Sequence, residues 1–203
     1  MIAHVRTIRL APGGLAQAIE TLRDTELVAL RQAAGFAGLI VLASLSDSAT
    51  GERVEVVALW ESGSALDGYA TTADQRAQQM PELPPQTAPA EERVYEVAQS
   101  AGMFGGTVAR FISASLDPGH IDTVVSLFEN VVMHAATEQR GFRRGLLLVD
   151  RESGHVISIG LWHSEADLRA SEQVGYLSQQ IGNFIQMVTV PIVPETLVVV
   201  IEG

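Results

Sequence analysis

The chain contains one pattern of residues twice, and this repeat constrains its fold more than any other feature. Two dipeptides recur 106 positions later (118 − 12 and 141 − 35): Pro12-Gly13 as Pro118-Gly119, and Gly35-Phe36 as Gly141-Phe142. The two tryptophans of the chain occupy matching contexts, Leu59-Trp60-Glu61-Ser62 and Leu161-Trp162-His163-Ser164. Solenoid repeats have periods of roughly 20 to 50 residues. The longer period therefore predicts two copies of one domain.

Each copy shows the same order of predicted elements. Residues 3–10 and 108–116 alternate between apolar and polar types, which predicts a first strand in each half. A Pro-Gly break follows, and then a helix with apolar residues spaced by three and four. A hairpin, a second helix that begins after the tryptophan and a last strand complete each half. This βαββαβ order is typical of a ferredoxin-like α+β fold, in which two helices cover one face of a four-stranded antiparallel sheet.

The repeats are expected over residues 1–99 and 107–203. Residues 100–106 contain three glycines and predict a linker between them. Helices cover only one face of each predicted sheet, so the other face needs cover as well. Two such sheets packed against each other would form an eight-stranded α+β barrel with pseudo-twofold symmetry. In the first half we expect the hairpin to turn at residues 47–51.

Composition excludes several kinds of chemistry. The chain has no cysteine, and all 13 of its basic residues are arginine. Thiolate catalysis, Cys-ligated zinc, iron-sulfur clusters and lysine Schiff bases are therefore excluded. The net charge of −11 argues against nucleic acid or an anionic membrane as a partner. No apolar run approaches the length of a membrane span, and no secretory signal pattern is visible at the N-terminus, so we expect a cytoplasmic protein.

These elements together resemble a known family. Strand, Pro-Gly, long helix, Gly-Phe, hairpin, Trp-x-Ser and second helix look like the antibiotic biosynthesis monooxygenase (ABM) domain of the dimeric α+β barrel superfamily, here in tandem. The resemblance covers nearly the whole chain, twice. That superfamily includes cofactor-independent oxygenases of aromatic polyketides, heme-degrading oxygenases, polyketide cyclases and lactone isomerases. The resemblance therefore implies a fold more narrowly than an activity.

Two sets of family residues are missing. Quinone-forming oxygenases of the family tend to have Asn four residues before the strand-end Trp, where this chain has Val56 and Ser158. Heme-degrading members use an Asn on the first strand and a His about ten residues after the Trp. At those places this chain has Thr7 and Ser113, and Ala70 and Glu172. The resemblance thus disfavours heme degradation.

Trp60 and Trp162 match the family position that lines the pocket between sheet and helices. Indole offers a flat apolar wall and one N–H donor to an aromatic ligand. The alternative is that each simply anchors sheet to helix. Beside Trp162 the strand carries Ser158 and a glycine, which predicts a roomier and more polar pocket in the second half, with Phe111 and Ser113 of the first strand as further lining.

Three other side chains are candidates for chemistry. His134 lies at the margin of an apolar helix face, where a partly buried imidazole would serve as a general base, or else as a structural or surface histidine. Arg110 would bind a carboxylate or phenolate, or pair with an acid across the barrel interface. Tyr69 would hydrogen-bond a ligand or pack its helix. No spacing of His and carboxylate residues predicts a metal site.

The leading hypothesis is a monooxygenase acting on a flat, apolar aromatic polyketide-type phenol in a dry pocket, with His134 as base. We expect no cofactor, with reduced flavin as the alternative that tandem members of the family suggest. A polyketide cyclase or isomerase, and a non-enzymatic module that binds small molecules, are the alternative functions. Pairing of the tandem protein into a further homodimer stays open.

Overall fold

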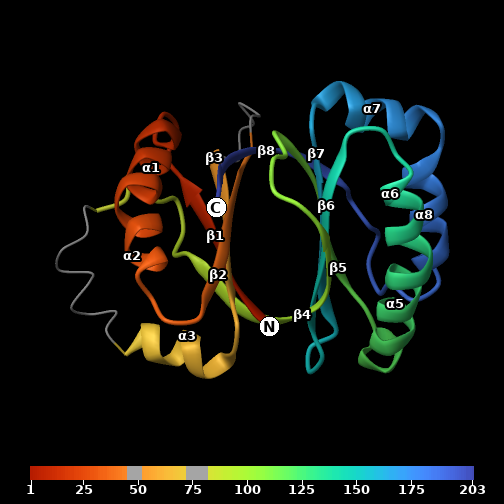
Figure 1. Ribbon diagram of the computed structural model, residues 1–203, viewed down its shortest axis with the longest axis horizontal. Helices are drawn as coiled ribbons and strands as arrows, with labels where there is room; N and C mark the ends of the chain where they lie inside the picture. The colour runs from red at the N-terminus through yellow and green to blue at the C-terminus, as the bar shows by residue number, and fades with distance from the viewer. Residues whose placement is uncertain (45–51, 72–81) are drawn as a thin grey trace. The chain divides into compact units, whose positions relative to one another are not determined.

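The computed structural model describes residues 1–44, 52–71 and 82–203. These residues form two compact units, Met1–Tyr95 with Val199–Gly203 and Glu96–Val198. In each unit the helices lie on one face of antiparallel strands (Figure 1). The predicted fold class, an α+β protein built from two ferredoxin-like βαββαβ repeats, is confirmed.

The first unit starts with strand β1, continues through a long helical stretch and a hairpin, and reaches a second helix. The elements are β1 (Ile2–Leu10), α1 (Leu15–Thr21), η1 (Leu22–Glu26), α2 (Leu27–Arg31), β2 (Phe36–Ala43), β3 (Glu52–Trp60), α3 (Gly63–Ala70) and the start of β4 (Glu91–Gly102). The strand order is β4-β1-β3-β2, as in ferredoxin-like sheets. β3 pairs antiparallel with both β1 and β2, so Trp60 lies opposite Ile2 and Phe36. The turn expected at residues 47–51 lies outside the described residues.

The second unit repeats this plan. Its elements are β5 (Val108–Ser115), η2 (Pro118–His120), α5 (Ile121–Leu127), η3 (Phe128–Met133), α6 (His134–Thr137), β6 (Phe142–Asp150), β7 (His155–Trp162), α7 (Glu165–Gln173), α8 (Tyr176–Phe184) and β8 (Glu195–Glu202). The strand order is β8-β5-β7-β6. Trp162 lies opposite Val108 and Phe142, which reproduces the pairing of Trp60.

Local sequence signals explain where the helices begin and end. Ser62 and Ser164 accept hydrogen bonds from the backbone N–H three residues later, as expected of N-cap residues. Gly35 and Gly141 follow the long helices with φ near +75°, a conformation that favours glycine. At Gly141 a Cβ atom would lie 2.5 Å from the Asp167 side chain, so the close approach of α7 also requires a glycine.

One feature of both long helices was not predicted. Leu22–Glu26 and Phe128–Met133 are π-helical, and the two segments begin 106 residues apart (128 − 22). The apolar residues of the sequence fit an ordinary helical period and carry no sign of this widened turn. Such turns are rare and occur often at functional sites, because they shift the side chains that follow.

The expected linker is partly strand. β4 continues through Gly102, and its residues Ser100 and Gly102 pair with Leu146 and Arg144 of β6. The end of β8 pairs with β2, since the backbone N–H of Gly203 donates to the carbonyl of Leu39. A strand at the edge of a sheet exposes backbone groups that need hydrogen-bond partners. β4 provides such partners for β6, and β8 provides them for β2. The compact units therefore differ from the predicted boundaries 1–99, 100–106 and 107–203.

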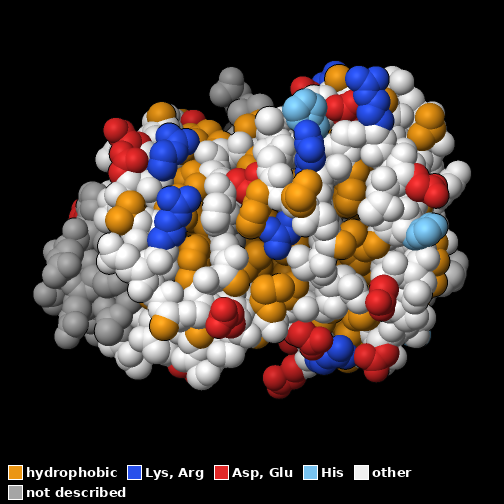
Figure 2. Space-filling model, viewed as in Figure 1, with side chains coloured by type: hydrophobic (Ala, Val, Ile, Leu, Met, Phe, Trp, Pro, Cys, Tyr) orange, Lys and Arg blue, Asp and Glu red, His pale blue; other side chains and the backbone are white. Residues whose placement is uncertain are grey.

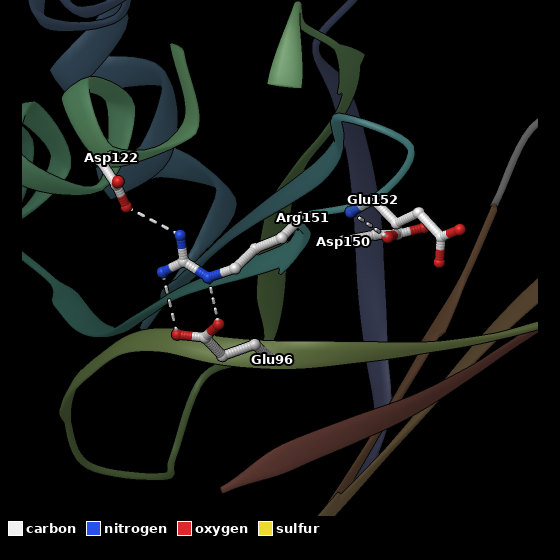
Figure 3. A network of polar contacts seen from close by, with 5 residues as sticks. All are labelled: Glu96, Asp122, Asp150, Arg151 and Glu152. Atoms are coloured by element: carbon white, nitrogen blue, oxygen red, sulfur yellow. Dashed lines mark hydrogen bonds and ion pairs between the residues drawn. The ribbon is translucent and has the colours of Figure 1, made fainter. Parts of the chain in front are cut away.

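Charged side chains gather in one place on the second unit. Figure 2 shows acidic side chains around a basic one, over the turn between β6 and β7 and the start of α5. Arg151 follows β6 in this part of the second unit, and its guanidinium donates to the Glu96 carboxylate (Nε–Oε2, 2.6 Å) and to Asp122 (Nη1–Oδ1, 2.8 Å) (Figure 3). The hydrogen bond from Arg151 lowers the pKa of Glu96 below its ordinary value. The network thus joins β4, α5 and the β6–β7 turn.

We expect Arg151→Ala to lower the free energy of unfolding by about 0.5–1 kcal/mol at pH 7, because the two carboxylates lose a half-exposed cation. A lowered folded-state pKa stabilises the protein above the unfolded pKa of Glu, about 4.3, and this contribution disappears as the pH falls through the folded value. Urea unfolding at pH 7 and pH 3.5 checks both statements. Arg169→Ala, which removes a single pair within α7, is the control with a smaller loss. An equal loss at both pH values would contradict the assignment.

No helix within the described ranges combines the length and apolar character needed to cross a membrane.

Candidate functional site

A cavity of about 60 Å³ lies beside Trp162, between the strands and helices of the second unit. β5 and β7 form its floor, and η3, α7 and α8 form its walls. Aliphatic and aromatic side chains dominate the lining, and they include Phe128, Met133, Phe142, Leu168 and Leu177. A cavity needs roughly 10–15 Å³ to hold one water, so this space corresponds to about four to six water-sized groups.

A second cavity of about 80 Å³ lies farther along β5. Both cavities share six lining residues: Ile112, Phe128, Val132, Ser158, Leu177 and Gln180. We call the two together the slot. The lining along β5 and the residue that follows it runs from Arg110 to Leu116, which at about 3.4 Å per residue corresponds to a length of about 20 Å. The slot therefore extends along β5, and its lining residues all belong to the second unit.

One end of the slot carries an ion pair. The guanidinium of Arg110, on β5, pairs with the carboxylate of Glu172, on α7. The two side chains are 14% and 34% exposed, so the acid reaches water while the cation is mostly covered. Burial lowers the pKa of Arg110 from its ordinary value, but arginine stays charged at neutral pH. A group that enters this end meets a covered cation next to a carboxylate.

Trp162 supplies an unused donor at the same end. Its indole Nε1–H is buried and has no hydrogen-bond acceptor among the described residues. Gly160 lies next to it, and a Cβ atom at that position would be 3.4 Å from Nε1. The missing side chain therefore leaves the N–H accessible from the slot. A buried donor without a partner costs stability. The indole N–H of Trp60 also has no acceptor among the described residues, so the cavity beside Trp162 is what distinguishes the donor in the second unit.

Tyr176 adds a phenol to this end of the slot. Its ring meets Trp162 edge to face, with 6.2 Å between ring centroids. Burial raises the pKa of Tyr176 to about 12, because the charged form would lose hydration. At neutral pH Tyr176 therefore keeps its proton.

The two halves differ in side-chain size at this place. Gly145 and Gly160 lie opposite each other on β6 and β7, where the first unit has Leu39 and Ala58. Nine residues after each tryptophan, the first half has Tyr69 and the second has Ser171. Smaller residues in the second half leave the space that forms the slot.

In the first unit the corresponding space holds side chains. Trp60 is fully buried, and its ring contacts Phe36 and Tyr69, with centroids 5.7 and 5.0 Å away. Arg6 and Glu26 form an ion pair there. Their repeat positions in the second unit, 106 residues on, are Ile112 and Val132, which line both cavities. Trp60 thus packs against Phe36 and Tyr69, whereas Trp162 borders a cavity.

Solved structures with this architecture are numerous, although no protein-family model and no curated protein matches the chain. A "putative monooxygenase" of Fusobacterium nucleatum superposes with a TM-score of 0.77 at 13% identity, covering 100% of this chain and 93% of that one. An anthrone oxidase-like protein gives 0.68 at 15% identity, over 100% and 92%. A Listeria monocytogenes ferredoxin-fold protein related to antibiotic biosynthesis monooxygenases gives 0.58 at 12%, over 98% and 94%.

The chain shares the fold of these monooxygenase-related proteins. The resemblance inferred from the sequence is therefore confirmed for the fold. At these identities the reaction has to be argued from the slot itself.

His134 is a surface histidine, which was the alternative to a partly buried general base. Its side chain is 79% exposed, and its Nε2 lies 4.0 Å from the Glu138 carboxylate on the same helix. The neighbouring residues Val132, Met133 and Ala136 line the slot instead. These three residues lie on the helix face that packs against the sheet. His134 lies on another face, is exposed to solvent and does not line the cavity.

Phe111 and Ser113 are also misplaced by the prediction. Successive residues of a strand point to opposite faces, and Arg110, Ile112 and Ala114 are the β5 residues that face the slot. Phe111 is buried without lining it. The hydroxyl of Ser113 hydrogen-bonds Nε2 of His155 at 3.0 Å, on an exposed part of the strand.

Three predicted residues, Arg110, Ser158 and Trp162, do line the slot. Trp60 and Tyr69 contact each other in the first unit. The site residues that sequence reasoning missed are Glu172, Ser171 and Gln180. A signal for the first two was available, because the 102-residue offset between the tryptophans (162 − 60) aligns Ser171 with Tyr69 and Glu172 with Ala70. Across the described part of the chain, no group of three or more potential ligand side chains is placed to hold a metal ion.

Titration of tyrosine tests the environment of this end of the slot. Absorbance at 295 nm should show one of the three tyrosines ionising near pH 12, and Tyr176→Phe should remove that step. A folded-state pKa above the unfolded value of about 10 stabilises the protein below pH 10, and this contribution declines as the pH rises toward 12. Wild type should therefore lose more stability than Tyr176→Phe between pH 9 and 11.5. Identical titration curves for the two proteins would refute the burial of this phenol.

Proposed function

We propose that the chain is a monooxygenase that oxidises an electron-rich aromatic phenol with molecular oxygen in the slot of the second unit. The observation that carries the proposal is the composition of the slot. An apolar space ends at a covered cation, a carboxylate and a buried N–H without an acceptor. Ligand sites of enzymes commonly combine an apolar lining with a few polar groups in this way.

The Arg110–Glu172 pair suits a hydroxyl group. A phenolic O–H donates to the carboxylate, and the phenol oxygen accepts from the guanidinium. Glu172 is a weak base toward a phenol, so proton transfer requires that nearby donors stabilise the phenolate. Arg110 supplies a charge for this purpose, and the N–H of Trp162 and the O–H of Tyr176 are neutral donors at the same end.

The remaining chemistry belongs to the substrate and oxygen. An electron-rich phenolate, or the carbanion in resonance with it, transfers electrons to O₂. For an anthrone-type substrate the ring CH₂ becomes a ketone, one oxygen atom enters the product, and the other leaves as water. The apolar lining excludes bulk water from the reactive intermediate. This scheme needs no cofactor, and reduced flavin is the alternative source of electrons.

Support for an aromatic substrate comes from the walls of the slot. Phe142 meets Trp162 edge to face at 5.5 Å, and Tyr176 meets it from another side. A ring inserted among them gains edge and face contacts with all three. The anthrone oxidase-like protein of the same fold agrees with this class of substrate.

Oxygen uptake with an anthrone-type probe tests the proposal. Purified protein under air, without flavin or metal, should consume oxygen and form the quinone faster than the buffer control. Glu172→Gln keeps the size of the side chain and removes the base, so kcat/KM should fall about 100-fold. Uptake equal to the buffer control, with and without reduced flavin, would refute an oxygenase.

A matched pair of glycine variants tests where the reaction occurs. Gly160→Ala places a methyl group 3.4 Å from the Trp162 Nε1, where it blocks a ligand oxygen, and should lower kcat/KM about tenfold or more. Gly182→Ala places the same group in open space on α8 and should leave the rate unchanged. Turnover of the probe without oxygen would instead indicate the cyclase or isomerase. Binding without any turnover would indicate a carrier or sensor.

A further inference from the structure

The second cavity of the slot is lined differently from the first. Polar residues of its lining, Ser158 and Gln180, are ones that it shares with the cavity beside Trp162. Within the described part of the chain, every residue that lines the second cavity alone is hydrophobic, including Leu116, Val124, Phe184, Val188 and Ile192. The polar groups of the site therefore gather at one end and the middle.

This lining selects what can occupy the far end. A hydroxyl or ketone there would find no hydrogen-bond partner, and burying it would cost roughly 1–3 kcal/mol by mutational measures. An oxygen-bearing group is thus disfavoured in the second cavity, so the oxygens of the aromatic substrate belong at the end beside Trp162. An aliphatic group needs no partner and gains free energy from leaving water.

We propose that the ligand is an elongated phenol, with its ring beside Trp162 and an aliphatic substituent along β5 in the second cavity. The inference rests on the proposed function for the placement of the ring. About 80 Å³ accommodates roughly five to eight groups the size of a water or methylene, which corresponds to a chain of about that many carbons. Ser158 and Gln180 lie where ring and chain meet, at the boundary that both cavities share.

A series of 4-alkylphenols, from 4-methylphenol to 4-octylphenol, tests this by isothermal titration calorimetry on the whole protein. Each buried methylene is worth about a fourfold gain in affinity, so Kd should fall about fourfold per carbon and level off once the cavity is full. Binding is measured without oxygen consumption. Absence of oxidation would therefore refute the oxygenase and leave this result standing, and a flat series with active oxidation would do the reverse.

Two neighbouring residues provide variant and control. Ile192 lines the second cavity, whereas Val193 is 67% exposed. Ile192→Trp should fill the far end, so that the ratio of Kd between 4-methylphenol and 4-hexylphenol approaches one. Val193→Trp should keep the wild-type ratio. Ile181→Trp, from α8, is a second way to fill the same space should Ile192→Trp not fold.

The proposal is overturned by either of two results. One is a wild-type Kd that does not depend on chain length. The other is a dependence that survives in both Ile192→Trp and Ile181→Trp, which would place the chain elsewhere on the protein.

Discussion

Burial of a tryptophan at the end of a strand is the constraint on which both units depend. Indole has a large apolar area, and its cover in each half comes from the helix that begins three residues later. Ser62 and Ser164 fix the starts of those helices, and Gly35 and Gly141 let the helices approach the sheet closely. The Trp-x-Ser and Gly-Phe signals of the sequence therefore both serve to pack a helix against the strand-end tryptophan.

The two units cover their tryptophans with different side chains, and this difference leaves the space of the slot. Tyr69 covers Trp60, whereas Ser171 occupies the same place near Trp162 and leaves room. Unfilled core volume is costly, on the order of 1–2 kcal/mol for a cavity of a few groups. The cavity beside Trp162 lowers the stability of the fold, so a role in binding a ligand explains it better than a role in stability.

Much of the fold and part of the site could be predicted from the sequence, and the wrong predictions have physical causes. Repeat markers and alternation predicted β1, β5 and the hairpins, because these signals depend on local periodicity. Phe111 and Ser113 were misplaced because the alternation of a strand defines two faces without saying which one lines the cavity. The π-helical turns left no mark in the apolar pattern. Glu172 was within reach of the repeat alignment, but its partnership with Arg110 depends on how α7 crosses β5.

Each unit has an ion pair near its tryptophan, and the position of that pair differs between the units. Arg6 and Glu26 pair in the first unit at the positions that Ile112 and Val132 occupy in the second. Replacing a buried ion pair with hydrophobic residues is often neutral or stabilising, so this exchange need not have weakened the fold. In the second unit the charge lies instead on Arg110 and Glu172, at the end of the space rather than across it. That arrangement leaves an apolar path along β5 and places the cation where a phenolate would need it.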